Sequence, residues 1–321
     1  MEHRQLGRTG VAVSKLCLGA MMFGAWGTTD HDESIRIIHR ALEAGINFID
    51  TADIYSQGES EVIVGKALAG GKRDNVVLAT KVWGQMGDDP NRGGVSRRWI
   101  IQEVESSLQR LGTDWIDLYQ VHRYEPGIDI DETLGALTDL VHEGKIRYIG
   151  TSAFPASAIV EAQWAARDRR LQRFVTEQPP YSILARGIEA DVLPTCRRYG
   201  MGVISWSPLS GGWLSGRYRK QGDVPTPMSE APDQLGQLAD EAGIPLIQLA
   251  IAFAANHPAV TAPIIGPRTM EHLESQLPAA DIVLGQAVLD RIDEIVPPGV
   301  NLNPADGGWV NPDLEPAARR R

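Results

Sequence analysis

The sequence predicts a (β/α)8 TIM barrel, and three observations support this fold. Eight short apolar runs alternate with longer amphipathic segments, which is the pattern of parallel βαβ units. No linker interrupts the alternation, so we expect a single barrel domain over residues 1–321, although a length of 321 residues also fits two domains. No Gly-x-Gly-x-x-Gly segment follows the first run, which makes a doubly wound nucleotide-binding sheet the less favoured alternative.

The first element expected is a β-hairpin at the N-terminus. Its strand-like segments are RQLG and VAVS, separated by Gly7 to Gly10. The eight barrel strands then follow along the chain. We expect them at residues 15–19, 47–50, 75–81, 116–122, 146–150, 174–178, 202–206 and 262–266.

Helices are expected between these strands. In the segment 32–45, Ile35, Ile38, Ala41 and Leu42 recur at helical spacing. Gly45 ends this segment, where a C-terminal cap belongs. Further helix-like segments span residues 96–112, 130–144, 157–170 and 187–200.

Two long segments have no regular pattern. Residues 207–229, after the seventh strand, are rich in Gly, Pro and Ser, which is typical of a binding loop or lid. Residues 297–316, near the C-terminus, are similarly irregular. This second segment contains Trp309, a large apolar side chain that we expect to pack against another part of the protein.

Composition narrows the class of partner. A net charge of −10 argues against nucleic acid or an anionic membrane surface as the main partner. Cys17 and Cys196 have no metal-ligand spacing, so we expect no metal site and a reducing cytoplasm. The sequence begins without a secretory signal pattern and has no apolar run of about 18 residues that would span a bilayer. It leaves open whether the chain forms a homo-oligomer.

Polar residues fall at the ends of the predicted barrel strands, where barrel enzymes carry their chemistry. They are Asp50, Lys81, His122, Ser152 and Gln178, with Tyr55 in the loop just beyond Asp50.

Asp50 and Lys81 end successive strands, so we expect them to pair, because a buried carboxylate is costly without a partner. A lysine ammonium beside Tyr55 would lower the pKa of that tyrosine from about 10, which would allow proton transfer near neutral pH. His122 could orient a carbonyl oxygen. Taken alone, the Asp–Lys pair is equally explained as structural and His122 as a buried core histidine, but all four groups converge on one rim.

Several segments, in order, resemble the aldo-keto reductases. GINFIDTADIYSQGESEVIVGKAL (45–68), ATKVW (79–83) and DLYQVHR (117–123) are similar to the segments that carry the catalytic residues of that family. IGTSAF (149–154), EQPPYS (177–182), SWSPLSGGWLSGRY (205–218) and PIIGPRT (263–269) are similar to its cofactor segments. The resemblance extends from the hairpin to about residue 295.

The resemblance implies a reductase that transfers hydride from NADPH to an aldehyde or ketone. It implies that Tyr55 is the general acid, that Lys81 lowers its pKa, and that Asp50 anchors Lys81. His122 would then help to bind and polarise the carbonyl. The nicotinamide carries the hydride, and the protein supplies orientation and an acid.

The resemblance also implies a set of cofactor contacts. Ser152 and Gln178 would hold the carboxamide, Trp206 would stack on the nicotinamide, and Arg268 would bind a 2′-phosphate and so favour NADPH over NADH. The other residues of the set are Gly19, Ala20, Met21, Asp50, Ser207, Pro208, Leu209, Gly211, Arg217, Gly266, His272 and Gln276. Ala153 and Gln276 depart from the residues that are usual in the family. Trp206 as a core aromatic and Arg268 as a solvated charge are the alternatives.

The substrate region is the least defined. Met22, Trp26, Trp83, Tyr124 and Trp309 are the candidate apolar walls, and they would suit a hydrophobic or aromatic carbonyl compound. Two rival functions remain open at this point. One is an NADPH-binding, redox-sensing regulatory subunit with slow turnover, because the resemblance includes the potassium-channel β-subunit branch. The other is a barrel isomerase or lyase without nicotinamide.

Overall fold

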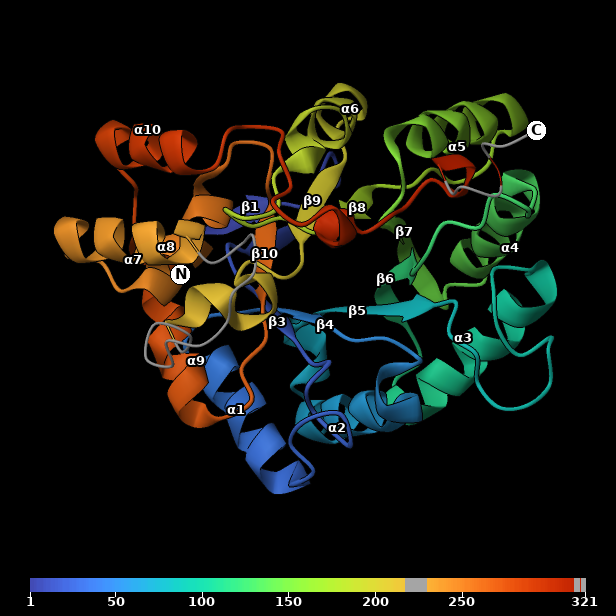
Figure 1. Ribbon diagram of the computed structural model, residues 1–321. Coiled ribbons are helices and arrows are strands. Elements are labelled where there is room, and N and C mark those ends of the chain that lie inside the picture. Colours follow the sequence, from blue (N-terminus) through green and yellow to red (C-terminus); the bar gives the residue numbers. More distant parts are fainter. Residues whose placement is uncertain (217–229, 315–317, 319–321) are drawn as a thin grey trace.

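The computed structural model of the chain describes residues 1–216, 230–314 and 318. Its centre is a closed parallel barrel with the strand order β10-β3-β4-β5-β6-β7-β8-β9 (Figure 1). The strands are β3 (Cys17–Gly19), β4 (Phe48–Asp50), β5 (Val77–Val82), β6 (Ile116–Val121), β7 (Ile146–Ser152), β8 (Thr176–Gln178), β9 (Gly202–Ser205) and β10 (Ala262–Ile265). The predicted barrel and its eight expected strands are confirmed.

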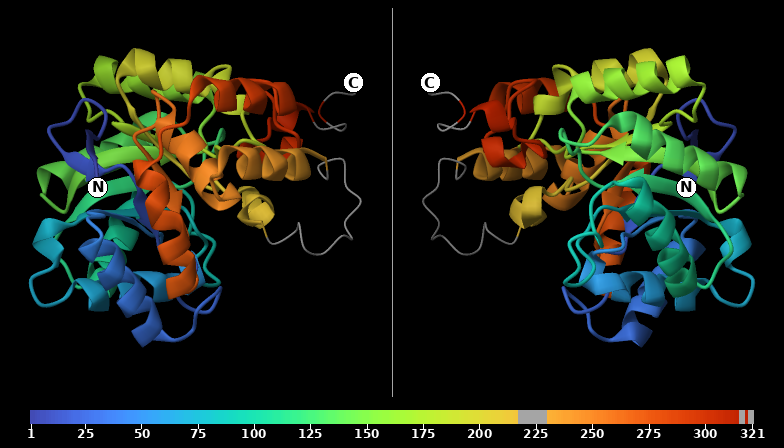
Figure 2. Two further views of the ribbon diagram at one scale, coloured as in Figure 1. Left: turned by 90° about the vertical axis from the view of Figure 1, so that its left-hand side faces the viewer. Right: turned by 90° about the vertical axis from the view of Figure 1, so that its right-hand side faces the viewer.

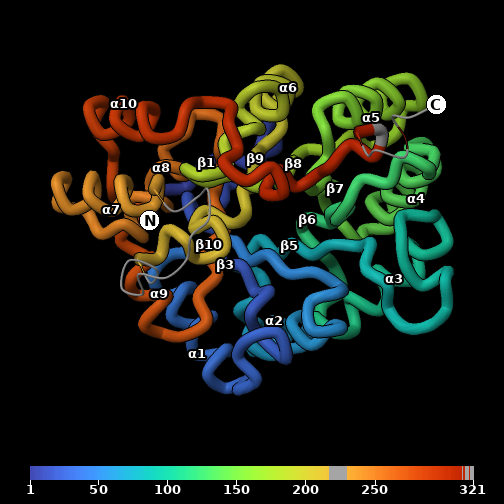
Figure 3. The backbone as a smooth tube through the Cα atoms, in the orientation of Figure 1, coloured from blue at the N-terminus to red at the C-terminus, as the bar shows by residue number. Residues whose placement is uncertain are grey.

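Helices surround the barrel, as the tube trace shows (Figure 3). They are α1 (His31–Glu43), α2 (Glu59–Leu68), α3 (Arg97–Leu111), α4 (Ile130–His142), α5 (Ala156–Arg169), α6 (Val192–Tyr199), α7 (Glu230–Ala242), α8 (Leu246–Asn256), α9 (Met270–Gln276) and α10 (Gln286–Ile295). The expected helices at 32–45, 96–112, 130–144 and 157–170 are confirmed to within a few residues.

The expected helix at 187–200 is wrong as a single element. It divides into a 3₁₀ turn, Gly187–Glu189, and α6. Pro194 lies in the first turn of α6, the part of a helix where a missing backbone N–H does no harm. A continuous helix over 187–200 would have placed this proline in its interior.

The first helix shows how the local sequence sets its ends. The side chain of Asp30 accepts a hydrogen bond from the Glu33 amide at 3.0 Å and caps the N-terminus of α1. Gly45 follows the helix with a φ of +89°, as the cap prediction requires. The buried face differs slightly from expectation, because it contains Ile37 beside Ile38 and Ala41, whereas Ile35 and Leu42 only flank the core.

The N-terminal hairpin closes one end of the barrel. Its strands β1 (His3–Gln5) and β2 (Ala12–Ser14) pair antiparallel, as predicted. Hairpin and strand residues together form a buried apolar cluster, namely Leu6, Val13, Cys17, Phe48, Ala79, Leu118, Ile204 and Ala262. The hairpin and the irregular C-terminal segment lie at opposite ends of the barrel (Figure 2).

A polar layer lies directly above that apolar cluster. Side chains two residues apart on a strand point to the same face. Two residues beyond Cys17, Phe48, Ala79 and Leu118 come, in order, Gly19, Asp50, Lys81 and Gln120. The buried interior therefore changes from apolar to polar at the C-terminal ends of the strands.

The described parts of the two long irregular segments lie at this polar end. After β9 comes a 3₁₀ segment, Ser210–Ser215, while residues 217–229 and the candidate Arg217 lie outside the described residues. The chain after α10 runs toward α5 (Figure 1) through 3₁₀ turns at Pro304–Gly307 and Pro312–Leu314. Trp309 packs edge-on against Tyr124 at 6.2 Å between ring centroids, so the expected docking of this tryptophan is confirmed.

Among the described residues, no single helix has both the length and the apolar composition to cross a membrane. One pair, α7 and α8, passes by length and composition together, but with a bend of 92° between the two helices.

Candidate active site

The site is built around a buried ion pair between neighbouring strands. Lys81 Nζ donates a short hydrogen bond to Asp50 Oδ1 and a second one, of 2.9 Å, to the Thr51 carbonyl. The Lys81 side chain is fully buried and Asp50 is 2% exposed. The pairing that the sequence predicted is therefore present, and both charges are removed from water.

Two glutamines complete the surroundings of Asp50. Gln120 Nε2 and Gln178 Nε2 donate to Asp50 Oδ2 at 2.9 and 2.8 Å. Gln178 Nε2 also donates to Gln120 Oε1 at 3.1 Å. Sequence reasoning missed Gln120, although it lies two residues before His122 on the same face of β6 and the alternation of that strand could have found it.

Tyr55 is held beside the lysine by an unusual turn. Its hydroxyl oxygen lies 3.2 Å from Lys81 Nζ. The next three residues, Ser56, Gln57 and Gly58, have φ values of +50°, +56° and +90°, and α2 begins directly after them. Residues other than glycine rarely adopt this left-handed backbone conformation, because it costs them about 1 kcal/mol or more each. The expected turn and helix start after Tyr55 are confirmed, and the turn is strained.

The prediction that the Tyr55 pKa would be lowered is wrong for the chain alone. Burial raises the pKa of the phenol above its ordinary value, and the charge of Asp50 adds to this effect. Lys81 is the strongest of the groups that act in the opposite direction. The ammonium itself is stable as a cation, because Asp50 and Tyr55 raise the pKa of Lys81 despite its burial.

His122 lies against the other side of Tyr55. The two rings meet edge to face with centroids 5.7 Å apart. Burial, together with the nearby charges of Lys81 and Arg123, holds the His122 pKa well below its usual value, so the imidazole is neutral at pH 7. His122 Nδ1 is buried and finds no hydrogen-bond partner among the described residues. The four residues predicted as a catalytic set are thus brought together.

A second ionic cluster, formed by Arg110, Glu61 and Glu103, packs against the turn that follows Tyr55. Arg110 pairs with Glu61 at 2.6 Å and, by a short contact, with Glu103. Arg110 packs so closely under Gly58 that a Cβ there would lie 2.7 Å from Arg110 Cδ. Asp53 accepts hydrogen bonds from the amides of Ile54 and Trp83. Sequence reasoning missed this cluster, because its members are far apart along the chain.

The predicted carboxamide pair lies next to the ion pair. Ser152 and Gln178 are register partners at the ends of β7 and β8, and Ser152 Oγ donates to the Gln178 carbonyl at 2.9 Å. Ala153, which stands where the family usually has a longer polar residue, has a φ of +53°. On the other side of Asp50, Gly19 is its register partner on β3 and the Ala20 amide donates to the Asp50 carbonyl at 2.8 Å.

The segment after β9 begins with a tight turn. Ser207, Ser210, Gly211 and Gly212 all have positive φ values. The amides of Ser210, Gly211 and Gly212 donate within the turn, to the Ser207 carbonyl, the Ser207 hydroxyl and the Leu209 carbonyl. Apart from the adjacent residues, no atom of the described chain lies within 4 Å of the point where a Cβ on Gly211 would be. Pro208 and Leu209 link Ser207 to this turn, and Leu209 packs against the core.

The remaining cofactor candidates follow β10. Gly266, Arg268 and His272 are exposed, whereas Gln276 is buried. Gln276 Oε1 is buried without a hydrogen-bond partner among the residues that the structure describes, so this region contains an acceptor that those residues do not satisfy. Thr28 Oγ1 donates to the Arg268 carbonyl at 2.7 Å, which connects this region to the loop that carries Trp26.

The candidate substrate residues lie at several places around the site. Trp26 lies 5.9 Å from the Tyr55 ring between centroids, and Tyr124 contacts both Phe154 and Trp309. Trp26 and Trp83 are exposed at the surface, and so is Met21, which is a cofactor candidate. Met22 lies within the Trp26 loop, where its carbonyl accepts from the Thr28 amide.

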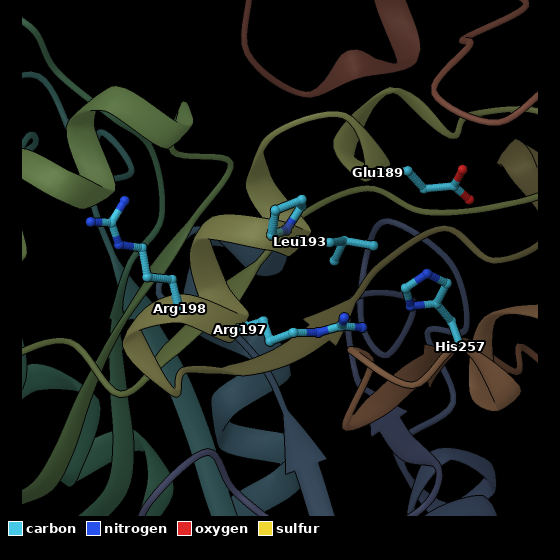
Figure 4. Close-up of a pocket in the computed structure, with 6 residues that line it drawn as sticks. Glu189, Leu193, Arg197, Arg198 and His257 are labelled. Carbon is cyan, nitrogen blue, oxygen red and sulfur yellow. The ribbon is translucent and has the colours of Figure 1, made fainter.

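A separate hollow of about 410 Å³ lies outside this site (Figure 4). It is lined by Glu189, Leu193, Pro194, Arg197, Arg198 and His257. Arg197 and His257 point toward the same space in Figure 4, while Arg198 lies apart from them. None of the four residues predicted as catalytic lines this hollow. Within the part of the chain that the structure describes, no three His, Cys, Asp or Glu side chains could together hold a metal ion.

Fold and geometry together define a class of protein, a (β/α)8 barrel with a buried carboxylate–lysine pair, a tyrosine and a neutral histidine at the C-terminal ends of its strands. Comparison with known proteins gives the family. The chain belongs to the Aldo/keto reductase family, which it matches over residues 15–297.

Three relatives illustrate the range of this family. The chain is 40% identical over 329 residues to "Uncharacterized oxidoreductase YrpG" of Bacillus subtilis (strain 168), covering 96% of this chain and 100% of the relative. It is 34% identical to "Probable voltage-gated potassium channel subunit beta" of Arabidopsis thaliana, covering 92% of this chain and 97% of that protein. It is 35% identical to "Norsolorinic acid reductase B" of Aspergillus parasiticus, with coverage of 91% and 83%. Family and relatives support an oxidoreductase of a kind that generally uses NADH or NADPH.

Proposed function

We propose that this protein reduces an aldehyde or ketone to an alcohol with NADPH, and that Tyr55 donates the proton. The observation that carries the proposal is the position of the Tyr55 hydroxyl, 3.2 Å from Lys81 Nζ, at the polar mouth of the barrel. The bound reduced nicotinamide supplies the hydride, while the protein positions the carbonyl and protonates its oxygen.

The electrostatics suit an acid rather than a base. Burial keeps the Tyr55 pKa above its ordinary value, so the phenol is protonated at pH 7 and is ready to donate. Lys81 opposes this rise and stabilises the phenolate that remains after transfer. Asp50 keeps Lys81 charged and in place. The protonated phenol is therefore in the form that carbonyl reduction requires.

His122 has a second role in this proposal. A neutral imidazole can donate one hydrogen bond and accept another, and His122 Nδ1 has no partner in the described part of the chain. We propose that His122 orients the carbonyl oxygen beside Tyr55. Trp26, Tyr124 and Trp309 would then form apolar walls around the rest of the substrate.

The residues present fit a nicotinamide dinucleotide. Gln178 uses Nε2 for its bonds to Asp50 and Gln120, which leaves Oε1 to accept from a carboxamide. The unsatisfied Gln276 Oε1 suits the amino group of adenine, and the open space at Gly211 allows close approach of phosphate oxygens. We assign the 2′-phosphate of NADPH to Arg268, whose guanidinium is exposed beyond β10.

The test compares Tyr55→Phe with the wild type and with Tyr199→Phe, which removes a hydroxyl at the end of α6. Reduction of 4-nitrobenzaldehyde is followed by the absorbance of NADPH, and NADPH binding by its fluorescence. We expect Tyr55→Phe to lower kcat by roughly 10²- to 10⁴-fold with NADPH affinity retained, and Tyr199→Phe to behave like the wild type. Turnover of Tyr55→Phe near the wild-type rate would contradict the assignment.

A redox-sensing regulatory subunit is the second candidate, favoured by the likeness to proteins named potassium channel β-subunits. Such a protein would bind NADPH but turn over slowly. The same assay separates the two functions, because a turnover number within the usual range for enzymes, roughly 1 to 10³ s⁻¹, supports a metabolic reductase. We keep the cytoplasm as the proposed compartment, consistent with the two free cysteines.

A further inference from the structure

Arg123 extends over the mouth of the barrel. It directly follows His122, just beyond the end of β6, yet its guanidinium carbon lies 6.0 Å from the centroid of the Trp206 ring, just beyond the end of β9. The strands β7 and β8 separate β6 from β9 in the barrel. A side chain that starts at one strand and ends beside the other must therefore cross over the C-terminal ends of the strands between them.

Residues 1–216, 230–314 and 318 do not satisfy the guanidinium. Within them, Arg123 Nη1 is buried without a hydrogen-bond partner, and Arg123 forms no ion pair with an acidic residue. Glu125, two residues further along the chain, packs against Gly94 instead. A contact of 6.0 Å with Trp206 is at the outer limit for a cation–π interaction. Because an arginine cannot lose its charge in a protein, a buried N–H without a partner is costly.

The charge of Arg123 also acts on the reacting end of the site. It is one of the charges that lower the pKa values of Tyr55 and His122. The Asp50–Lys81 pair is internally balanced and His122 is neutral, so none of these three residues cancels the positive charge of Arg123. This local charge contrasts with the net charge of −10 for the whole chain and would attract anions.

We infer that Arg123 binds an anionic group of the carbonyl substrate, a carboxylate or a phosphate. This inference rests on the proposed function and names its substrate class. The guanidinium offers paired N–H donors that match both anions. Its place between the ends of β6 and β9 would hold the anion on one side while the carbonyl lies beside Tyr55 and His122.

The test uses two matched pairs of aldehydes with NADPH. 4-Carboxybenzaldehyde is compared with methyl 4-formylbenzoate, and glyceraldehyde 3-phosphate with glyceraldehyde, so that the pairs distinguish carboxylate from phosphate. The proteins are the wild type, Arg123→Met, Arg123→Lys and Arg97→Met. Arg97→Met is the control, because this substitution also removes one arginine charge, but from an exposed pair with Asp139 between α3 and α4. Benzoate and benzamide are titrated in parallel by tryptophan fluorescence.

We expect the wild type to prefer the anionic member of at least one pair, measured as the ratio of kcat/KM values. Arg123→Met should lower that ratio by roughly 10- to 100-fold, the effect of losing a charged hydrogen bond, and Arg123→Lys should restore part of it. Arg97→Met should leave the ratio unchanged. The ratio is informative because any effect of Arg123 on Tyr55 applies to both members of a pair.

Two outcomes would overturn the inference if the protein reduces aldehydes, and benzoate binding decides it if the protein does not. Ratios near one in the wild type would overturn it while leaving the reductase proposal intact. A weaker affinity for NADPH in Arg123→Met with an unchanged ratio would assign the residue to the nucleotide instead. If no aldehyde is reduced, the proposed function fails, and the anion site is then decided by whether benzoate binds at least tenfold tighter than benzamide and loses that advantage in Arg123→Met.

Discussion

Replacing Lys81 by methionine should reveal how strongly the buried pair constrains the barrel. Methionine has a similar length and no charge, so the variant leaves Asp50 buried and uncompensated. Asp50 retains the two donors Gln120 and Gln178, at 2.9 and 2.8 Å. Removing one partner of a buried pair costs about 3–5 kcal/mol of unfolding free energy. We expect a value near the lower end, because the two amide donors remain.

The loss should depend on pH, because removing Lys81 leaves a buried carboxylate without a cation. Burial disfavours the charged form of a carboxyl group. A carboxyl group with a raised pKa binds more protons in the folded state, so stability is greatest at low pH and falls as the pH rises through the folded pKa. The deficit of Lys81→Met should therefore be larger at pH 8 than at pH 5.

A double-mutant cycle tests this reasoning directly. Urea unfolding is followed by tryptophan fluorescence for the wild type, Lys81→Met, Asp50→Asn and the double variant at both pH values. The double variant has no uncompensated charge, so we expect its unfolding free energy at pH 8 to exceed that of Lys81→Met by about 2 kcal/mol or more. The exposed pair between Arg97 and Asp139 serves as the control, because exposed pairs contribute little. A double variant no more stable than Lys81→Met would refute the reasoning.

Three further predictions concern other residues of the site. Arg268→Ala should raise the KM for NADPH at least tenfold more than the KM for NADH, and equal losses would count against a 2′-phosphate contact. Burial raises the pKa of Glu177 to about 8, so the unfolding free energy of the wild type should fall between about pH 4.5 and 8 by an amount on the order of a few kcal/mol. Glu177→Gln should remove most of this pH dependence, as measured by urea unfolding. Equal pH dependence in the variant and the wild type would exclude Glu177 as its cause. Gln276→Met should raise the unfolding free energy by about 1 kcal/mol, because it removes an unsatisfied buried acceptor. The same variant should bind NADPH more weakly in a fluorescence titration, and an increase in both stability and NADPH affinity would contradict the adenine contact.

Much of the fold follows from the sequence, because a closed parallel barrel has a simple pattern. Its strands are buried on both faces, so each one reads as a short apolar run bounded by polar or turn residues. The contact between Asp50 and Lys81 follows in the same way, since they end neighbouring strands. The prediction of a single helix at 187–200 is wrong, because Pro194 is tolerated in the first turn of a helix but not in its interior.

The properties of the site were harder to predict, because they depend on burial and on loop paths. The raised Tyr55 pKa results from desolvation, which outweighs the effect of Lys81, and no sequence pattern reports that balance. The left-handed conformations of Ser56 and Gln57 could not be foreseen from residues that usually avoid them. Nor could the sequence show that Arg123 reaches Trp206, because that contact depends on how the chain leaves β6.

The shared hydrogen bonds of Asp50 have a consequence for redesign of this protein. One carboxylate accepts from Lys81, which adjoins the tyrosine, and from Gln178, which adjoins the proposed nicotinamide pocket. A substitution at Gln178 chosen to change the fit of the nicotinamide would also remove a hydrogen bond from the carboxylate that holds Lys81 beside Tyr55. Nicotinamide binding and acid strength are therefore coupled through Asp50, and directed evolution of the nicotinamide pocket should select for compensating changes at Gln120 or Lys81.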